Sequence, residues 1–299
     1  TYTVLGLFLT WCGMAYRFNA ATGAFPLAVL AVHQIRGKGI GSKVSLTTII
    51  SGGVLTVALF AMVWLVNSYR FPTFERLERN TNSDSIMRYD LIGISAFSGV
   101  SVVPSVTGQP VPVSYLKSIY DPRHLNITGN NDVQKLVAGQ IPNICSLWMR
   151  SIAAHPIAYL HHRADVFREY IGLHSHDVFY VTNPSIDANH LGVSFTPTSF
   201  KSWFATKMWD SRNSLLCRVY LYYVFAALLL VSAFIFGDKK YTQLAAFSLA
   251  SGYLYLLPMF VITPAADLRY NCWSVAASIL AGIFSIASIR SRLREQQRS

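Results

Sequence analysis

Long runs of apolar residues without a charged side chain dominate both ends of the chain. The longest, residues 44–66, has 23 residues. As a helix it would be about 34 Å long, enough to cross the hydrocarbon core of a bilayer. Three further charge-free runs lie in the last third of the chain and two weaker apolar runs precede the longest one: residues 219–236, 244–262, 273–289, 2–16 and 20–35. We therefore predict an α-helical polytopic membrane protein with about six transmembrane helices.

Basic residues gather in three short segments that border these runs. The segments are residues 36–43, residues 237–243 and the tail from residue 290 onward. If the six runs cross the membrane alternately, all three segments lie on one face, which the positive-inside rule makes cytoplasmic. We predict a multi-pass protein, integral to the cytoplasmic membrane, with a cytoplasmic carboxy-terminal tail and with residues 67–212 on the extracytoplasmic side.

These assignments divide the chain into three parts. Residues 1–66 form three transmembrane helices, and residues 67–212 form a mixed, mainly helical extracytoplasmic domain between helices 3 and 4. Residues 213–299 form three more transmembrane helices and the basic tail. Because the sequence starts with Thr1 inside an apolar run, we expect the first part to be the tail of a larger membrane domain and the chain to be a fragment.

Two helices are predicted within the extracytoplasmic domain. Residues 88–98 form a short amphipathic helix, and residues 148–173 form a helix broken at Pro156, a residue that fits the first turn of a new helix. The second helix carries an apolar stripe that we expect to pack on the domain, with Arg163 away from it. The stripe consists of Ile157, Leu160, Ala164, Phe167 and Ile171.

The charge distribution excludes several classes of protein. Only 13% of the residues are charged, about half the usual fraction for soluble domains, which argues against both a disordered chain and an ordinary soluble enzyme. The net charge is +11. Residues 67–212 hold 13 basic and 11 acidic groups, so most of the excess positive charge borders the apolar runs. Since no basic face interleaved with aromatic residues occurs, we predict no nucleic-acid partner.

Neither a metal nor a cofactor is predicted. The four cysteines include no CxxC pair, and the pair His174 and His176 lies in a glycine-containing loop. These two histidines, with His161 and His162 before them, would suit a zinc site only if three or four ligands converged. A solvated loop with histidines on a helix surface is the simpler interpretation. No GxSxG, P-loop, GxGxxG or HExxH motif is present.

Four charged residues are candidates for chemistry at the outer membrane surface. Asp90 is a weak candidate for a general base, or a structural carboxylate paired with Arg88 or with a helix N-terminus. Asp267 is a second weak candidate, as a base or a ligand of a sugar hydroxyl. Arg17 and Arg269 each lie between two apolar runs, where a guanidinium can bind a lipid phosphate. The alternatives are a snorkelling arginine at position 17 and an Asp267–Arg269 ion pair.

Several stretches are similar to segments of a known class of membrane enzyme. Residues 17–27, 88–99, 118–123, 143–163 and 264–275 resemble the later part of bacterial integral membrane glycosyltransferases of the GT-C fold. The resemblance implies a polytopic enzyme that moves a sugar from a polyprenyl-phosphate donor to an extracytoplasmic acceptor. In that fold the catalytic Asp lies in the first extracytoplasmic loop, whereas the loop at residues 17–19 here contains no carboxylate.

Two functions of different class follow. The first is part of a membrane glycosyltransferase that transfers a sugar to a cell-envelope acceptor, with the catalytic Asp on a preceding portion. The second is a non-catalytic, membrane-anchored extracytoplasmic domain that recognises a cell-envelope glycan or a partner protein. Transport is a weaker third possibility, because charged groups within the runs are scarce and no inverted repeat is evident.

Overall fold

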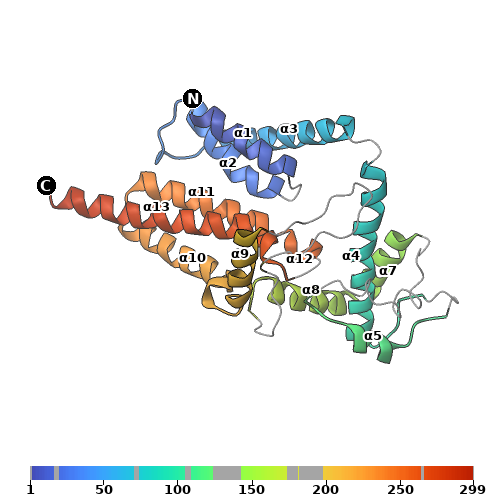
Figure 1. Cartoon of the computed structure of the whole chain (residues 1–299). Coiled ribbons are helices and arrows are strands. Elements are labelled where there is room, and N and C mark those ends of the chain that lie inside the picture. Colours follow the sequence, from blue (N-terminus) through green and yellow to red (C-terminus); the bar gives the residue numbers. More distant parts are fainter. Residues whose placement is uncertain are drawn as a thin grey trace. The chain divides into compact units, whose positions relative to one another are not determined.

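A computed structural model describes residues 2–16, 20–70, 74–104, 109–123, 143–173, 181, 198–263 and 266–298. The regular elements in these ranges are helices (Figure 1), and an isolated antiparallel β-bridge joins Pro104 and Pro110. Two compact units divide the chain. Unit 1 comprises residues 1–72, 219–259 and 270–299, and unit 2 comprises residues 73–218 and 260–269.

Unit 1 contains the apolar helices. They are α1 (Tyr2–Tyr16), α2 (Ala20–Ile35), α3 (Leu46–Arg70), α10 (Val219–Phe236), α11 (Lys239–Leu256) and α13 (Cys272–Gln296). The short α12 (Met259–Ile262) follows α11, and a 3₁₀ turn, Leu268–Asn271, precedes α13. The residues of both elements are divided between the two units.

Among the residues that the structure describes, four stretches are long and apolar enough to cross a membrane, which makes the chain an α-helical membrane protein. They are Leu46–Val66, Val219–Phe236, Lys239–Ile262 and Leu268–Gln296. The helices α1 and α2 are apolar but shorter, with 15 and 16 residues. The prediction of a membrane protein built from helices is confirmed at this level.

The helices of unit 1 pack through small and hydroxyl-bearing residues. Helix α11 lies along α13 and α2 (Figure 1), and α2 lies along α3. Ser251 of α11 joins both neighbours, because it donates a hydrogen bond to the carbonyl of Gly23 on α2 at 2.5 Å and accepts one from the Trp273 indole of α13 at 3.0 Å. At the contact of α2 with α3, the backbone of Gly52 lies directly against Val29. Small residues allow such close approach of helices in a membrane.

Unit 2 is built around α4 (Phe74–Ser98), with α5 (Val113–Ile119), α7 (Ile144–Ala154), α8 (Pro156–Tyr170) and α9 (Ser199–Asp210). Helix α4 contacts α5, α7 and α8. Their shared core consists of Tyr89, Leu91, Ile92, Val103, Val111, Leu116, Ile144 and Val166. The helix predicted for residues 88–98 is the last part of α4, which starts earlier than expected. The break at Pro156 is confirmed, because α7 ends at Ala154 and Pro156 is the first residue of α8.

The predicted apolar stripe of α8 is wrong. The buried face of α8 consists of Ala158, His162, Arg163, Val166 and Tyr170. Ile157 is 65% exposed and Leu160 is 47% exposed. The helix is therefore turned so that two polar side chains face the core. The physical reason is a buried carboxylate on α4 that requires polar partners.

Helix α9 carries an exposed aromatic face. None of its twelve residues is buried. The Phe200 ring lies against Trp203 and Phe204, with centroids 5.9 and 6.2 Å apart. Thr198 caps the helix by accepting a hydrogen bond from the Lys201 backbone N–H at 3.3 Å. This exposed aromatic face is unusual for a helix of a soluble domain.

Candidate functional site

A cluster of ionisable side chains lies in the core of unit 2, centred on Asp90. Asp90, His162 and Arg163 are each 0% exposed. One Arg163 guanidinium nitrogen lies 2.6 Å from Asp90 Oδ1, and His162 Nε2 lies 3.0 Å from the same oxygen. The indole of Trp148 donates a hydrogen bond to Asp90 Oδ2 at 2.7 Å. The carboxylate is therefore enclosed by donors from α7 and α8.

The hydrogen bonds fix the tautomer of His162. Its Nδ1 lies 2.9 Å from the hydroxyl of Tyr120. Burial raises the pKa of the Tyr120 hydroxyl, which therefore keeps its proton and donates to Nδ1. Nε2 must then carry the proton that it donates to Asp90. The result is a continuous chain of hydrogen bonds from Tyr120 through His162 to the carboxylate.

His162 is held in its neutral form. Burial lowers the pKa of the imidazole below its usual value, although the hydrogen bond to Asp90 opposes the shift. The positive charge of Arg163 also disfavours protonation. A neutral imidazole beside an Asp90–Arg163 ion pair leaves the cluster without net charge, which is the favourable state for a buried group of this kind.

The lowered pKa of His162 predicts a pH-dependent stability. Between the folded pKa and the unfolded value of about 6.5, the unfolded chain binds more protons than the folded one. The free energy of unfolding therefore falls as the pH falls through this window. We expect the melting temperature of the full chain in detergent to drop on going from about pH 7 to about pH 5.

A neutral replacement should remove the part of this dependence that belongs to His162. The substitution His162→Gln keeps an N–H donor for Asp90 but does not titrate. The matched control is His161→Gln, because His161 is adjacent on α8 and exposed. Melting curves at several pH values would contradict the assignment if His161→Gln flattened the pH dependence as much as His162→Gln does.

The partners of Asp90 differ from those predicted. They are Arg163, His162 and Trp148, rather than Arg88 or the start of a helix. His162, expected on a helix surface, is buried. Close packing with α4 explains its position, because a Cβ at Gly93 of α4 would clash with the His162 ring. The glycine thus leaves room for the imidazole to reach Asp90 (Gly93 and Asp90 lie nearly one turn apart).

The second predicted carboxylate, Asp267, is part of a compact turn. Its Oδ1 accepts a hydrogen bond from the Arg269 backbone N–H at 2.8 Å, and its Oδ2 accepts one from Arg269 Nε at 2.7 Å. A terminal guanidinium nitrogen of Arg269 also contacts Oδ2. The Asp267 side chain is 5% exposed, whereas the Arg269 side chain is 45% exposed. The predicted ion-pair alternative is therefore present, and it leaves the guanidinium at the surface.

Asp121 and Arg123 form a second turn of the same design, which the sequence analysis missed. Asp121 Oδ1 accepts from the Arg123 backbone N–H at 2.9 Å and from Arg123 Nε at 2.8 Å. Asp121 Oδ2 accepts from a terminal nitrogen of Arg123 at 2.7 Å. The signal that could have revealed the pair is the shared Asp-x-Arg spacing, Asp121-Pro-Arg123 and Asp267-Leu-Arg269.

One segment of unit 2 connects these groups. The backbone N–H of Ala266 donates a hydrogen bond to the Arg123 carbonyl at 2.8 Å, which joins the two Asp-x-Arg turns. Three residues earlier, the carbonyl of Thr263 accepts a hydrogen bond from Arg163 at 3.1 Å. The structure thus brings the Asp90 cluster and both turns to the same short segment.

The remaining predicted groups lie partly outside the described residues. Arg17, His174 and His176 are among them, so the lipid-phosphate role of Arg17 stays a prediction. In the ranges that the structure describes, no group of three or more His, Cys, Asp or Glu residues could hold a metal ion. None of Cys12, Cys145, Cys217 and Cys272 forms a disulfide.

Comparisons with known proteins found no relative of the chain. No family model, no curated protein and no solved structure matches it. The helices and the enclosed Asp90 cluster define an α-helical membrane protein with a polar core in unit 2.

Proposed function

We propose that the chain binds the phosphate of a polyprenyl-phosphate lipid at the membrane surface, as part of a membrane glycosyltransferase that serves a cell-envelope acceptor. The observation that carries the proposal is the turn of Asp267 and Arg269. Its carboxylate is nearly buried and holds a guanidinium whose side chain is 45% exposed. A cation fixed in this way is preorganised for a second anion.

Phosphate chemistry suits this arrangement. A guanidinium carries five N–H donors in a planar fork and can bind two anions on different edges. Attraction between arginine and phosphate grows where the dielectric constant falls, as it does near a membrane. Arg269 lies at the start of the candidate membrane span Leu268–Gln296, three residues before the first residue of α13. The Arg123 turn, hydrogen-bonded to the same segment, offers a second cation of the same kind.

The topology proposed with this function has six crossings. The two short apolar helices, α1 and α2, cross together with the four longer ones, and the three basic segments face the cytoplasm. Residues 67–212 and the Asp267–Arg269 turn then lie on the extracytoplasmic side. A polyprenyl-phosphate donor presents its phosphate at this surface.

We assign the catalytic base to neither Asp90 nor Asp267 in this proposal. A general base must reach the proton that it removes, either directly or through one water molecule. Asp90 is enclosed by Arg163, His162 and Trp148, and Asp267 is engaged by Arg269. In this proposal the two carboxylates act only as positioning residues: Asp90 holds Arg163 in place and Asp267 holds Arg269.

The substitution Arg269→Lys tests the phosphate contact. We expect it to weaken polyprenyl-phosphate binding about tenfold, because lysine keeps the charge but loses the planar fork. Arg123→Lys should act in the same direction. Binding is measured by titrating polyprenyl phosphate into the full chain in nanodiscs.

A matched control comes from the same unit. Arg168 is also paired with an aspartate, Asp165, at 3.7 Å, and its side chain is 52% exposed. Arg168→Lys should bind like the parent. The proposal is wrong if the Lys and Ala variants of both Arg269 and Arg123 bind polyprenyl phosphate as tightly as the parent does.

Helix α9 favours a second candidate function. Its exposed Phe200, Trp203 and Phe204 form an apolar surface of the kind that recognises other molecules. This is the observation behind a non-catalytic, membrane-anchored domain that recognises a cell-envelope glycan or a partner protein. Unchanged lipid binding in the arginine variants would make this alternative the better supported one.

A further inference from the structure

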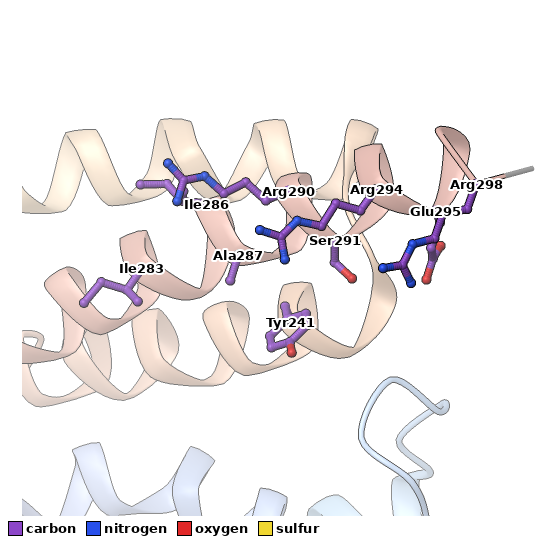
Figure 2. Close-up of a pocket in the computed structure, with 9 residues that line it drawn as sticks. All are labelled: Tyr241, Ile283, Ile286, Ala287, Arg290, Ser291, Arg294, Glu295 and Arg298. Atoms are coloured by element: carbon purple, nitrogen blue, oxygen red, sulfur yellow. The ribbon is translucent and has the colours of Figure 1, made fainter.

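A groove with a polar and an apolar part lies in unit 1, toward the carboxy-terminal end of α13. Its volume is about 740 Å³. Figure 2 shows that its lining comes mainly from α13, with one side chain from the neighbouring helix α11. The lining residues are Tyr241, Ile283, Ile286, Ala287, Arg290, Ser291, Arg294, Glu295 and Arg298.

The cationic part of the groove follows from helical spacing. Arg290, Arg294 and Arg298 are four residues apart, so successive arginines project from nearly the same side of the chain. Tyr241, in the first turn of α11, lines the same groove (Figure 2). Among the described residues of unit 1, none of these three arginine side chains takes part in an ion pair, whereas Arg292 pairs with Glu295 at 3.3 Å.

The apolar part continues the same face toward the middle of the helix. Ile283, Ile286 and Ala287 precede Arg290 and carry no polar side-chain group. Together the two parts form a surface that is apolar at one end and strongly basic at the other. A free phosphate would satisfy only the basic end.

The length of α13 places the change from apolar to basic at a membrane surface. The helix has 25 residues, about 38 Å, whereas a hydrocarbon core is about 30 Å thick. Residues 273–289 are free of charge. The helix therefore extends beyond the apolar core with its arginines at the level of lipid headgroups.

We propose that this groove binds an anionic phospholipid. The guanidinium groups of Arg290 and Arg294 bind the headgroup phosphate, and Arg298 adds to the positive field. The first part of an acyl chain lies along Ile283 and Ile286. Arginine suits this role because its fork binds phosphate oxygens in pairs, and basic residues next to a transmembrane helix attract anionic lipids.

The test compares two exposed arginines of α13, one that lines the groove and one that does not. Arg292 is two residues from Arg294, about 200° around the helix, and it does not line the groove. Both Arg292→Gln and Arg294→Gln remove one positive charge from an exposed position. Short-chain phosphatidylglycerol is titrated into each full-chain variant in neutral detergent, and bound lipid is counted by native mass spectrometry.

We expect Arg294→Gln to weaken phosphatidylglycerol binding about tenfold, and Arg292→Gln to change it by less than about twofold. Phosphatidylcholine and inorganic phosphate should both bind more weakly than phosphatidylglycerol. Equal losses in the two variants would overturn the groove in favour of diffuse attraction by the basic tail. If phosphatidylcholine binds as tightly as phosphatidylglycerol, the groove does not require an anionic headgroup and the proposal is wrong. If inorganic phosphate binds as tightly, the ligand is a free phosphate and not a lipid. If the parent chain binds no phosphatidylglycerol, the proposal is wrong.

Discussion

Replacing Asp90 by Asn is expected to destabilise unit 2 by about 3–5 kcal/mol, because the change leaves the Arg163 charge buried without a counter-ion. Arg163 is fully buried, and Asp90 is the one carboxylate that pairs with it among the described residues. The amide keeps the size of the side chain, so the loss comes from charge. The measurement is hydrogen exchange of α4 and α8 in the full chain, since local protection reports the stability of one unit.

The control for this prediction is Asp165→Asn. Asp165 also pairs with an arginine, but at the surface and 3.7 Å away, so the loss should stay below about 1 kcal/mol. Adding Arg163→Met to Asp90→Asn should recover part of the stability, because it removes the unpaired charge. Unchanged protection of α4 and α8 in Asp90→Asn would contradict the assignment of Asp90 as the buried counter-ion of Arg163.

Replacing Gly52 by Ala is expected to destabilise unit 1 by about 1–3 kcal/mol. A Cβ at this position would lie 2.7 Å from the Val29 Cα and 2.8 Å from its backbone nitrogen. A backbone cannot move aside as a flexible side chain can. Helices α2 and α3 would therefore have to separate. Thermal unfolding of the full chain in detergent measures the effect.

The neighbouring glycine provides the control. A Cβ at Gly53 would meet only the Phe25 ring, at 3.6 Å, an ordinary van der Waals distance. Gly53→Ala should be neutral or slightly stabilising, because alanine is the better helix former. A chain with Gly52→Ala that melts like Gly53→Ala would show that the two helices have room to adjust.

The membrane helices could be predicted from sequence because hydrophobicity is a local property. The charge-free run at residues 219–236 has the same bounds as α10. The charge-free run at 273–289 is shorter than α13, which continues to Gln296. Arginine is a good helix former and its long side chain can reach the interface, so the helix does not end where the apolar run ends.

The core of unit 2 could not be predicted in the same way. The buried face of α8 was predicted wrongly because it is set by the contact of His162 with Asp90. Asp90 lies 72 residues before His162 in sequence, and no local pattern connects the two. Asp90 itself was identified as a candidate, but its partners were not. The Asp267–Arg269 pair was foreseen as an alternative because its members are two residues apart. Residues at that separation are close together in space whatever the fold.

The hydrogen bond from Arg163 to Thr263 has a consequence for the order in which the protein is made. The two residues are 100 positions apart, and α10 and α11 lie between them. At synthesis rates of about 5–20 residues per second, Thr263 emerges roughly 5–20 s after Arg163. During that interval unit 2 lacks residues 260–269, so the hydrogen bond of Arg163 forms only after the chain of both intervening helices has been synthesised. A ribosome that stalls before residue 260 would leave an incomplete unit, open to quality-control proteases.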